Sequence, residues 1–360
     1  MTDIFAVILA GGKGERFWPL STARRPKQFL ALAGDKPLLS MAVDRLAGLI
    51  PTERVLVITS ADLAGAAREA APQVPAANVI GEPFGRDTAA ACALGGALVK
   101  ARSPGAVFCI LTADQIMGNV ELYQETLRQS FALAASRDSL LTIGIKPAFP
   151  STGFGYIESA EPVAENNGIQ FLKVKRFVEK PDPRTAEQFV AAGRYYWNSG
   201  MFIWSVNAFE SALARHCPAL HAMARRLAPA VGTPSFESTL RAEYERIGRI
   251  SVDYALMEKA DNIVMARGTF PWDDVGSWTA LGNHIPADAS GNAVLGACEA
   301  LESKGNVVVS ENRLTALFGV EDLVVVHAEH ATLICPKSRA QEIKKLVQKL
   351  GENPEYRQLL

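Results

Sequence analysis

Unbroken apolar runs alternate with helix-like segments through about residue 145. The first run, residues 4–9, has the pattern of a strand that is buried on both faces, and residues 54–59, 106–112 and 140–145 are also strand-like. The intervening segments have the periodicity of helices: residues 37–49, 63–71, 87–101 and 120–135. This alternation predicts right-handed crossovers and a parallel sheet with helices on both faces.

From residue 153 the strand-like segments become longer, at residues 154–158 and 169–179. Residues 195–204 are rich in aromatic side chains and place Asn198 and Gly200 beside a strand. Amides among aromatic rings are typical of a sugar site, in which hydroxyls are hydrogen-bonded and ring faces stack. An aromatic core strand that begins with a turn explains the same residues equally well. Helices are predicted across residues 205–260.

After about residue 287 the chain consists of short strand-like runs with Gly-Asn turns at 291–292 and 305–306. The runs are residues 307–310, 314–318, 323–326 and 332–335, and a helix is predicted at 338–350. We therefore expect two domains: an α/β catalytic domain at residues 1–286, and a small β-rich domain with β-helix-like coils and a terminal helix at residues 287–360.

A Gly-rich loop follows the first strand and carries three cations. Backbone N–H groups of such a loop can point into one concavity, which suits phosphate oxygens. The predicted nucleotide contacts here are Leu9, Ala10, Gly11, Gly12, Lys13, Gly14, Arg16 and Lys27. We interpret the loop as a cradle for a nucleoside triphosphate; the alternative is an ordinary turn at the end of a strand.

Two familiar phosphate-binding loops do not fit this sequence. A P-loop would need a glycine where Val7 stands, and the dinucleotide fingerprint would need one where Phe17 stands. Trp18-Pro19 and Arg25-Pro26 also disfavour a helix directly after the loop, because proline keeps its predecessor out of the α region. The loop is therefore of another kind.

Composition limits the classes of partner. The 360 residues carry a net charge of −1, without the basic stripe of a nucleic-acid binder. The five cysteines are scattered, and the first apolar run is too short for a signal peptide or a membrane span. We expect a cytoplasmic protein with no nucleic-acid or membrane partner. The sequence leaves the oligomeric state open, with a homodimer as one candidate.

Two carboxylates are candidates for one Mg²⁺ site. Asp114 ends the apolar run of residues 108–114, and Asp274 lies between two tryptophans in residues 272–278. Mg²⁺ prefers one or two carboxylates together with phosphate oxygens. Asp114 could instead cap a following helix. Lys180 is a candidate for holding a sugar phosphate. Since a phosphate nucleophile is already an anion, no general base is needed.

Five ordered motifs carry a resemblance to a known family. They are residues 11–21 with 26–30, residues 82–91, residues 177–181, residues 197–200 and residues 272–278. Together they resemble the sugar-nucleotide pyrophosphorylases and, more narrowly, the mannose-1-phosphate guanylyltransferases. The resemblance covers nearly the whole chain, although we expect the isomerase domain that is fused to some relatives to be missing.

The resemblance implies a Rossmann-like nucleotidyltransferase core with a mixed sheet. It also implies an Mg²⁺-dependent reaction of GTP with mannose 1-phosphate to give GDP-mannose and pyrophosphate. The implied roles fall on these residues: Asp114 and Asp274 on the metal, Arg16 and Lys27 on the triphosphate, Lys180 on the sugar phosphate, Gly155, Glu179 and Asn198 on the sugar hydroxyls, and Glu82, Asp87 and Thr88 near the base.

Two departures from the family pattern bear on these expectations. Asp87-Thr88-Ala89-Ala90 stands where relatives often have Asn-Thr-Ala-Pro, and Gln115 follows Asp114 where they often have His. Asp87 could accept from the guanine edge or cap the helix that follows.

Three alternative functions remain: a pyrophosphorylase for another sugar and nucleotide, a catalytically silent sugar-nucleotide sensor, and a metal-dependent glycosyltransferase. The last usually carries Asp-x-Asp, and no two aspartates here are two positions apart.

Overall fold

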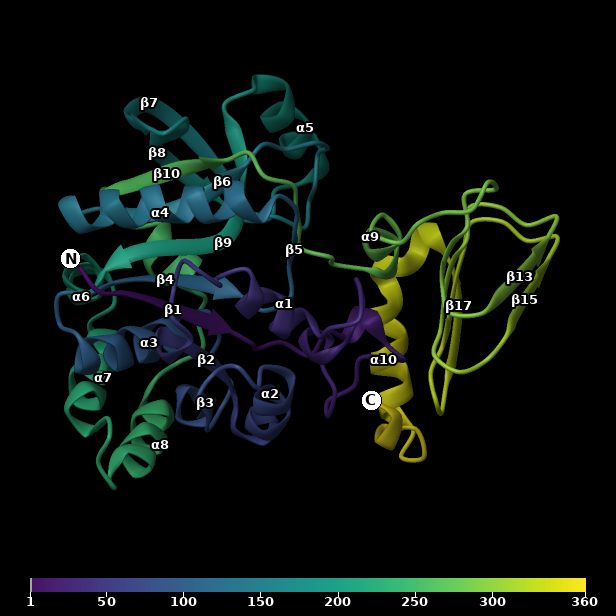
Figure 1. The fold of residues 1–360 in the computed structure, drawn as a ribbon, viewed down its shortest axis with the longest axis horizontal. Helices are drawn as coiled ribbons and strands as arrows, with labels where there is room; N and C mark the ends of the chain where they lie inside the picture. The colour runs from purple at the N-terminus through teal and green to yellow at the C-terminus, as the bar shows by residue number, and fades with distance from the viewer. Residues whose placement is uncertain (1) are drawn as a thin grey trace. The chain divides into compact units, whose positions relative to one another are not determined.

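Nine strands of the N-terminal part form one mixed sheet in the computed structural model, which describes residues 2–360 (Figure 1). The strand order is β3-β2-β1-β4-β9-β6-β10-β8-β7. The bounds are β1 Ile4–Leu9, β2 Val55–Ser60, β3 Val79–Glu82, β4 Val107–Thr112, β6 Leu140–Ile145, β7 Tyr156–Asn166, β8 Ile169–Val178, β9 Tyr195–Ser205 and β10 Ile263–Gly268.

The first four strands of the chain are parallel, as predicted, but the sheet does not continue that way. β9 inserts between β4 and β6 and runs antiparallel to both. The sheet strands through residue 145 therefore all run in one direction, as predicted, but β9 interrupts their order, and the mixed-sheet core is confirmed. The reason is that β9, an aromatic strand, supplies Trp204 and Phe202 to the core beside β4. This pairing joins residues about one hundred positions apart. Local sequence periodicity therefore could not predict it.

Helices cover both faces of this sheet, as predicted. Phe108 and Ile110 of β4 share a core cluster with α3, whereas Cys109, between them, faces the other side towards Tyr123 of α4. The helices are α1 Leu38–Asp44, α2 Ala64–Ala70, α3 Thr88–Arg102, α4 Val120–Ser136, α5 Pro183–Ala192, α6 Val206–His216, α7 Pro218–Leu227 and α8 Phe236–Arg246. The helix expected at 37–49 ends early, and turns follow it.

The close packing of α3 determines where its N-terminus lies. A Cβ on Gly95 would lie 2.8 Å from Val7 of β1, and one on Gly96 would lie 2.7 Å from Phe209 of α6. Only glycine allows this approach without displacing a neighbour. The helix therefore holds Asp87 and Thr88 at a defined place beside the sheet.

Contacts along the chain divide it into two units. Of the described residues, the first unit contains 2–10, 42–113 and 117–272, and the second contains 11–41, 114–116 and 273–360. The Gly-rich loop from Gly11 onward and Asp114 thus belong to the same unit as the C-terminal strands. The expected domain boundary at residue 286 stays a prediction. No helix within residues 2–360 is long and apolar enough to span a membrane.

The second unit is built on short parallel strands that stack in coils. β12, β14 and β16 pair in parallel and β17 closes that sheet antiparallel, while β13 pairs in parallel with β15. The bounds are β12 Ala293–Leu295, β13 Cys298–Leu301, β14 Val307–Ser310, β15 Thr315–Phe318, β16 Leu323–His327 and β17 Thr332–Pro336. The β-rich C-terminal part is confirmed.

Two turn asparagines connect successive coils. Asn292 and Asn306 are fourteen residues apart, and both are buried. The side-chain amide of Asn306 donates to Asn292 Oδ1 at 2.9 Å. The expected terminal helix is a 3₁₀ segment, η8 (Lys337–Glu342), followed by α10 (Ile343–Glu352). Other short elements include η1 Glu15–Phe17, η2 Lys27–Phe29, α9 Trp278–Gly282 and the paired short strands β5 Ile116–Met117 and β11 Trp272–Asp273.

Candidate active site

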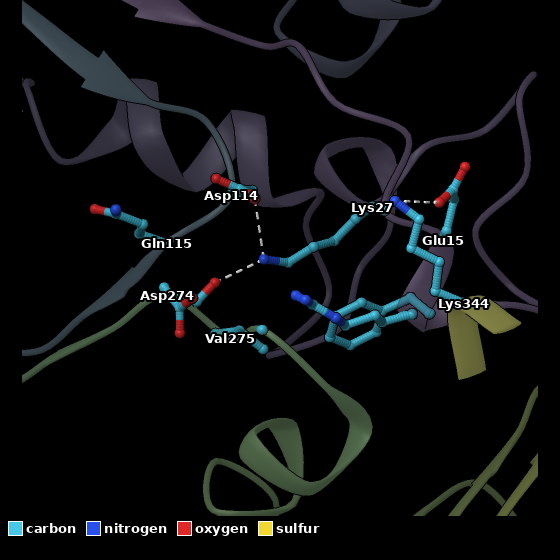
Figure 2. Close-up of a pocket in the computed structure, with 11 residues that line it drawn as sticks. Glu15, Lys27, Asp114, Gln115, Asp274, Val275 and Lys344 are labelled. Atoms are coloured by element: carbon cyan, nitrogen blue, oxygen red, sulfur yellow. Dashed lines mark hydrogen bonds and ion pairs between the residues drawn. The ribbon is translucent and has the colours of Figure 1, made fainter. Parts of the chain in front are cut away.

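The second unit contains a pocket of about 420 Å³, the loop pocket (Figure 2). It is lined by residues 14–17, 27, 114–115, 274–276 and 344. Five predicted site residues meet here: Gly14, Arg16, Lys27, Asp114 and Asp274. The φ of 59° at Gly14, with a would-be Cβ 2.6 Å from Lys27 Cβ, requires glycine. Lys344 and Gln115 also line the loop pocket and were not predicted.

Lys27 is the central cation of the loop pocket. Its side chain is only 6% exposed. Its ammonium donates to Asp114 Oδ2 at 3.1 Å and to the Asp274 carbonyl at 2.7 Å, and lies 5.4 Å from the Phe17 ring centroid (Figure 2). A buried ammonium needs such partners to offset its loss of hydration. Lys27 therefore holds three distant segments of sequence together.

The two candidate metal carboxylates interact electrostatically. Burial raises the pKa of Asp274 to about 6, and the negative charges of Asp273 and Asp114 act in the same direction, while Lys27 and Arg16 oppose them. Carboxylates that repel each other at one pocket are suited to sharing a cation. Asp114 does not cap a helix, since Asn119 caps α4 by accepting from Leu122 N at 3.1 Å.

The turn that contains Asp274 has a strained backbone, and side-chain contacts of Asp273 stabilise it. Val275 has a φ of 47°, which is unfavourable for a β-branched residue. Asp273 accepts from Val275 N at 2.7 Å through one oxygen and lies 2.9 Å from His284 Nε2 through the other. Strain of this kind is concentrated at functional sites.

The start of the Gly-rich loop lies outside the loop pocket. Leu9 and Ala10 belong to the first unit, where Ala10 N donates to Ile58 O and Thr59 Oγ1 donates to Ala10 O. Gly11, Gly12 and Lys13 are in the second unit but do not line the loop pocket. Their nucleotide contacts stay predictions.

The first unit has its own pocket, of about 520 Å³, which we name the Lys180 pocket. It is lined by residues 87–88, 179–180, 249–251 and 253–254. It therefore combines the predicted residues Asp87, Thr88, Glu179 and Lys180. Asp87 and Lys180 both have positive φ values, 67° and 45°, in conformations that non-glycine residues rarely adopt.

A connected set of contacts joins the predicted sugar residues. Lys180 pairs with Glu179, and Gly155 allows Glu179 to approach, since a Cβ on Gly155 would lie 2.4 Å from Glu179 Oε2. Asn198 N donates to Gly155 O at 2.8 Å, and its side-chain amide donates to Asp253 Oδ1 at 2.7 Å. Asn198 and Gly155 thus support the Lys180 pocket without lining it.

Sequence reasoning missed Asp253. Burial first and then the charge of Glu179 raise its pKa, to about 6, against the lowering effect of the Asn198 amide. The signal available in sequence was one acidic residue within the apolar segment of residues 252–257, in a stretch that was assigned only to a helix. In the structure this stretch is a single π-helical turn, Asp253–Met257.

The three residues predicted near the base have defined structural partners. Asp87 accepts from Thr88 N at 2.8 Å, which confirms its capping role, and lies 3.6 Å from Arg249. Thr88 Oγ1 accepts from Val252 N at 2.9 Å. Glu82 accepts from Tyr244 OH at 2.8 Å, and burial raises its pKa to about 7; it does not line the Lys180 pocket. Their contacts with a base stay predictions.

Two family models match the chain. The model "Nucleotidyl transferase" matches residues 5–291, and the model "MannoseP isomerase/GMP-like beta-helix domain" matches residues 296–350. Their combined span accounts for the α/β core and the coiled strands that follow.

Proteins similar to this chain are mannose-1-phosphate guanylyltransferases. It is 33% identical to mannose-1-phosphate guanylyltransferase 2 of Escherichia coli O157:H7, over 98% of this chain and 75% of that protein. It is 35% identical to an Escherichia coli mannose-1-phosphate guanylyltransferase, over 97% and 74%. A crystal structure from Thermus thermophilus, described as mannose-1-phosphate geranyltransferase, superposes with a TM-score of 0.88 at 34% identity and covers 97% of this chain and 99% of that one.

We predict that Asp253→Asn increases stability at neutral pH. The pKa of Asp253 is raised from an ordinary 3.8 to about 6, so the unfolded chain loses its proton first as the pH rises. Stability therefore falls between about pH 4 and pH 6 and stays lower above that range. Asparagine removes the ionisation and keeps an acceptor for Asn198. The variant should gain at most about 3 kcal/mol above pH 6 and almost nothing at pH 4.

Urea unfolding at pH 4 and pH 7.5 measures this difference. Asp62→Asn, which changes an exposed aspartate, is the control and should show no pH-dependent gain. A variant that gained nothing at pH 7.5 would contradict the electrostatic account of the Lys180 pocket.

Proposed function

The chain belongs to the nucleotidyl transferase family and to its mannose-1-phosphate guanylyltransferases, and we propose that it makes GDP-mannose and pyrophosphate from GTP and mannose 1-phosphate. The observation that carries the reaction class is the loop pocket, where cations and three carboxylates, including Asp114 and Asp274, surround one space. The relatives along nearly the whole chain support the choice of substrates.

The loop pocket is proposed to bind the triphosphate. Arg16 is exposed and can reach phosphate oxygens, whereas Lys27 is fixed by Asp114 and the Asp274 carbonyl. Triphosphate binding supplies new anionic partners for both cations. Positive charge held in place before the reaction stabilises the charge that develops on the departing pyrophosphate.

The Lys180 pocket is proposed to bind the sugar phosphate. Lys180 would pair with the phosphate, and Glu179 would accept from sugar hydroxyls. Asn198 and Gly155 would hold Glu179 and Asp253 in place through the contacts described above. Asp87, Thr88 and Glu82 are proposed to lie near the base, in the segment where this chain departs from the family pattern.

The reaction itself needs little proton chemistry. A phosphate oxygen of mannose 1-phosphate attacks the α-phosphorus of GTP, and the bond from that phosphorus to the β-bridging oxygen breaks. The electron pair leaves with pyrophosphate. Since the attacking oxygen is already ionised, the residues act by neutralising charge and aligning the reacting atoms.

The loop pocket fits a bound Mg²⁺. Asp114 and Asp274 are the proposed ligands, because the charge of Asp114 raises the pKa of Asp274 and both line one pocket. Within residues 2–360 no cluster of three or more His, Cys, Asp or Glu could hold a metal. Phosphate oxygens would therefore complete the coordination, as Mg²⁺ commonly requires. Bound Mg²⁺ would supply positive charge to the α-phosphate.

We predict that GTP and mannose 1-phosphate are the preferred substrate pair. Five nucleoside triphosphates would be combined with mannose, glucose and galactose 1-phosphates in the presence of Mg²⁺, and pyrophosphate release would be followed. The GTP and mannose 1-phosphate pair should have the highest kcat/KM. A higher value for another pair would change the assigned substrates. Binding without turnover for every pair would indicate a sensor.

We predict that Asp114→Asn and Asp274→Asn each lower kcat by about 100-fold or more, since each removes a metal carboxylate. Each variant should need more Mg²⁺ for half-maximal rate. If the two carboxylates share one ion, the double variant should be far less impaired than additivity requires.

The control is Asp35→Asn, an exposed aspartate in the same unit, which should turn over normally. Melting temperatures check that the folds are intact. Full additivity together with an unchanged Mg²⁺ requirement would show that Asp114 and Asp274 serve separate sites.

A further inference from the structure

The C-terminal helix contributes a cation to the loop pocket. Lys344 lines the pocket, and its ammonium lies 3.5 Å from Glu15 Oε2 (Figure 2). The two side chains are 57% and 29% exposed. A separation of 3.5 Å exceeds a normal hydrogen bond, so the pair is loose and the ammonium retains free donors. The sequence motifs pointed to the Gly-rich loop, not to this helix.

Buried neighbours hold Lys344 at the pocket. Ile343, the preceding residue, and Val347, one turn later, are buried in the same core cluster as Phe17 and Trp18 of the loop segment. The helix α10 packs against η1 (Glu15–Phe17). Trp18 Nε1 donates to Leu359 O at 2.9 Å, which ties the loop segment to the end of the chain. Lys344 therefore has a fixed Cα position at the rim of the pocket.

The other charged residues of the loop pocket, Lys27 and Glu15, indicate what Lys344 does there. Lys27 lines the pocket, but it already donates to Asp114 and to the Asp274 carbonyl, and its side chain is only 6% exposed. Glu15 places a carboxylate at a pocket proposed to hold phosphates, where its charge would repel them. Lys344 is close enough to offset Glu15 and exposed enough to contact a phosphate at the same time.

We propose that Lys344 is a further triphosphate-binding residue, which contacts the β- or γ-phosphate of the bound nucleotide while remaining beside Glu15. This inference rests on the proposed function, because it assumes that the loop pocket holds the triphosphate. It assigns part of nucleotide recognition to the C-terminal helix, far in sequence from the Gly-rich loop.

Equilibrium binding measured by calorimetry tests this role without relying on turnover. Lys344→Met should weaken GTP binding by about threefold to tenfold, the range expected for an exposed charge-assisted contact. Binding of GMP, which has no β- or γ-phosphate, should be unchanged. Lys345→Met is the matched control: Lys345 is the next residue of the helix, is 76% exposed and pairs with Glu342. It should bind GTP as the wild type does.

The same substitution made in a Glu15→Gln protein distinguishes a direct contact of Lys344 with phosphate from simple neutralisation of Glu15. If Lys344 touches the phosphates, Lys344→Met weakens GTP binding in the Glu15→Gln protein as well as in the wild type. An effect that disappears in the Glu15→Gln background would overturn the proposed contact, because Lys344 would then act only on Glu15.

The remaining outcomes are also decisive. Equal GTP affinities for Lys344→Met and Lys345→Met, with GTP bound by the wild type, would overturn this inference alone. An equal loss for GTP and GMP would overturn it as well, since the contact would not involve the outer phosphates. If the wild-type protein bound no GTP, the proposed function would fail and this inference with it.

Discussion

The buried ammonium of Lys27 is the interaction on which the loop pocket depends. It joins Asp114, 87 residues away, to the backbone of Asp274, 247 residues away. The chain as a whole is nearly neutral, so an anion site has to be built from local charge. Removing one partner of a buried, paired charge leaves the other uncompensated, which costs several kcal/mol. The same contact therefore maintains the pocket and aligns its carboxylates.

Buried carboxylates and residues with strained backbones at the two pockets reduce the stability of the fold. Asp274 and Asp253 both have pKa values raised to about 6, mainly by burial, so each is kept ionised at neutral pH against a desolvation penalty. Val275, Asp87 and Lys180 have positive φ values, and each lines one of the two pockets. Packing elsewhere must offset these local costs. The combination is typical of residues retained for binding and chemistry rather than for stability.

The sequence predicted what depends on local pattern. Glycines beside cations identified the Gly-rich loop, the end of an apolar run led to Asp114, and the paired carboxylates between tryptophans led to Asp274. The sequence pattern did not predict that β9 would insert beside β4, because strand order depends on packing between distant segments. Lys344 looked like one of several lysines on an amphipathic helix, and only the burial of Ile343 and Val347 against Phe17 and Trp18 brings it to the pocket. The place of Asp253 in the Lys180 pocket could not be predicted for a similar reason, since its partner Asn198 lies 55 positions away.

In the proposed reaction, charge and alignment alone carry the transfer, in one displacement without a covalent enzyme intermediate. The most direct test uses GTP made chiral at the α-phosphorus by replacing one non-bridging oxygen with sulfur. The configuration at phosphorus is then determined in the GDP-mannose analogue that the enzyme forms. A single in-line attack by the sugar phosphate predicts inversion. Retention would require two successive displacements through a nucleotidylated side chain, and would contradict the account.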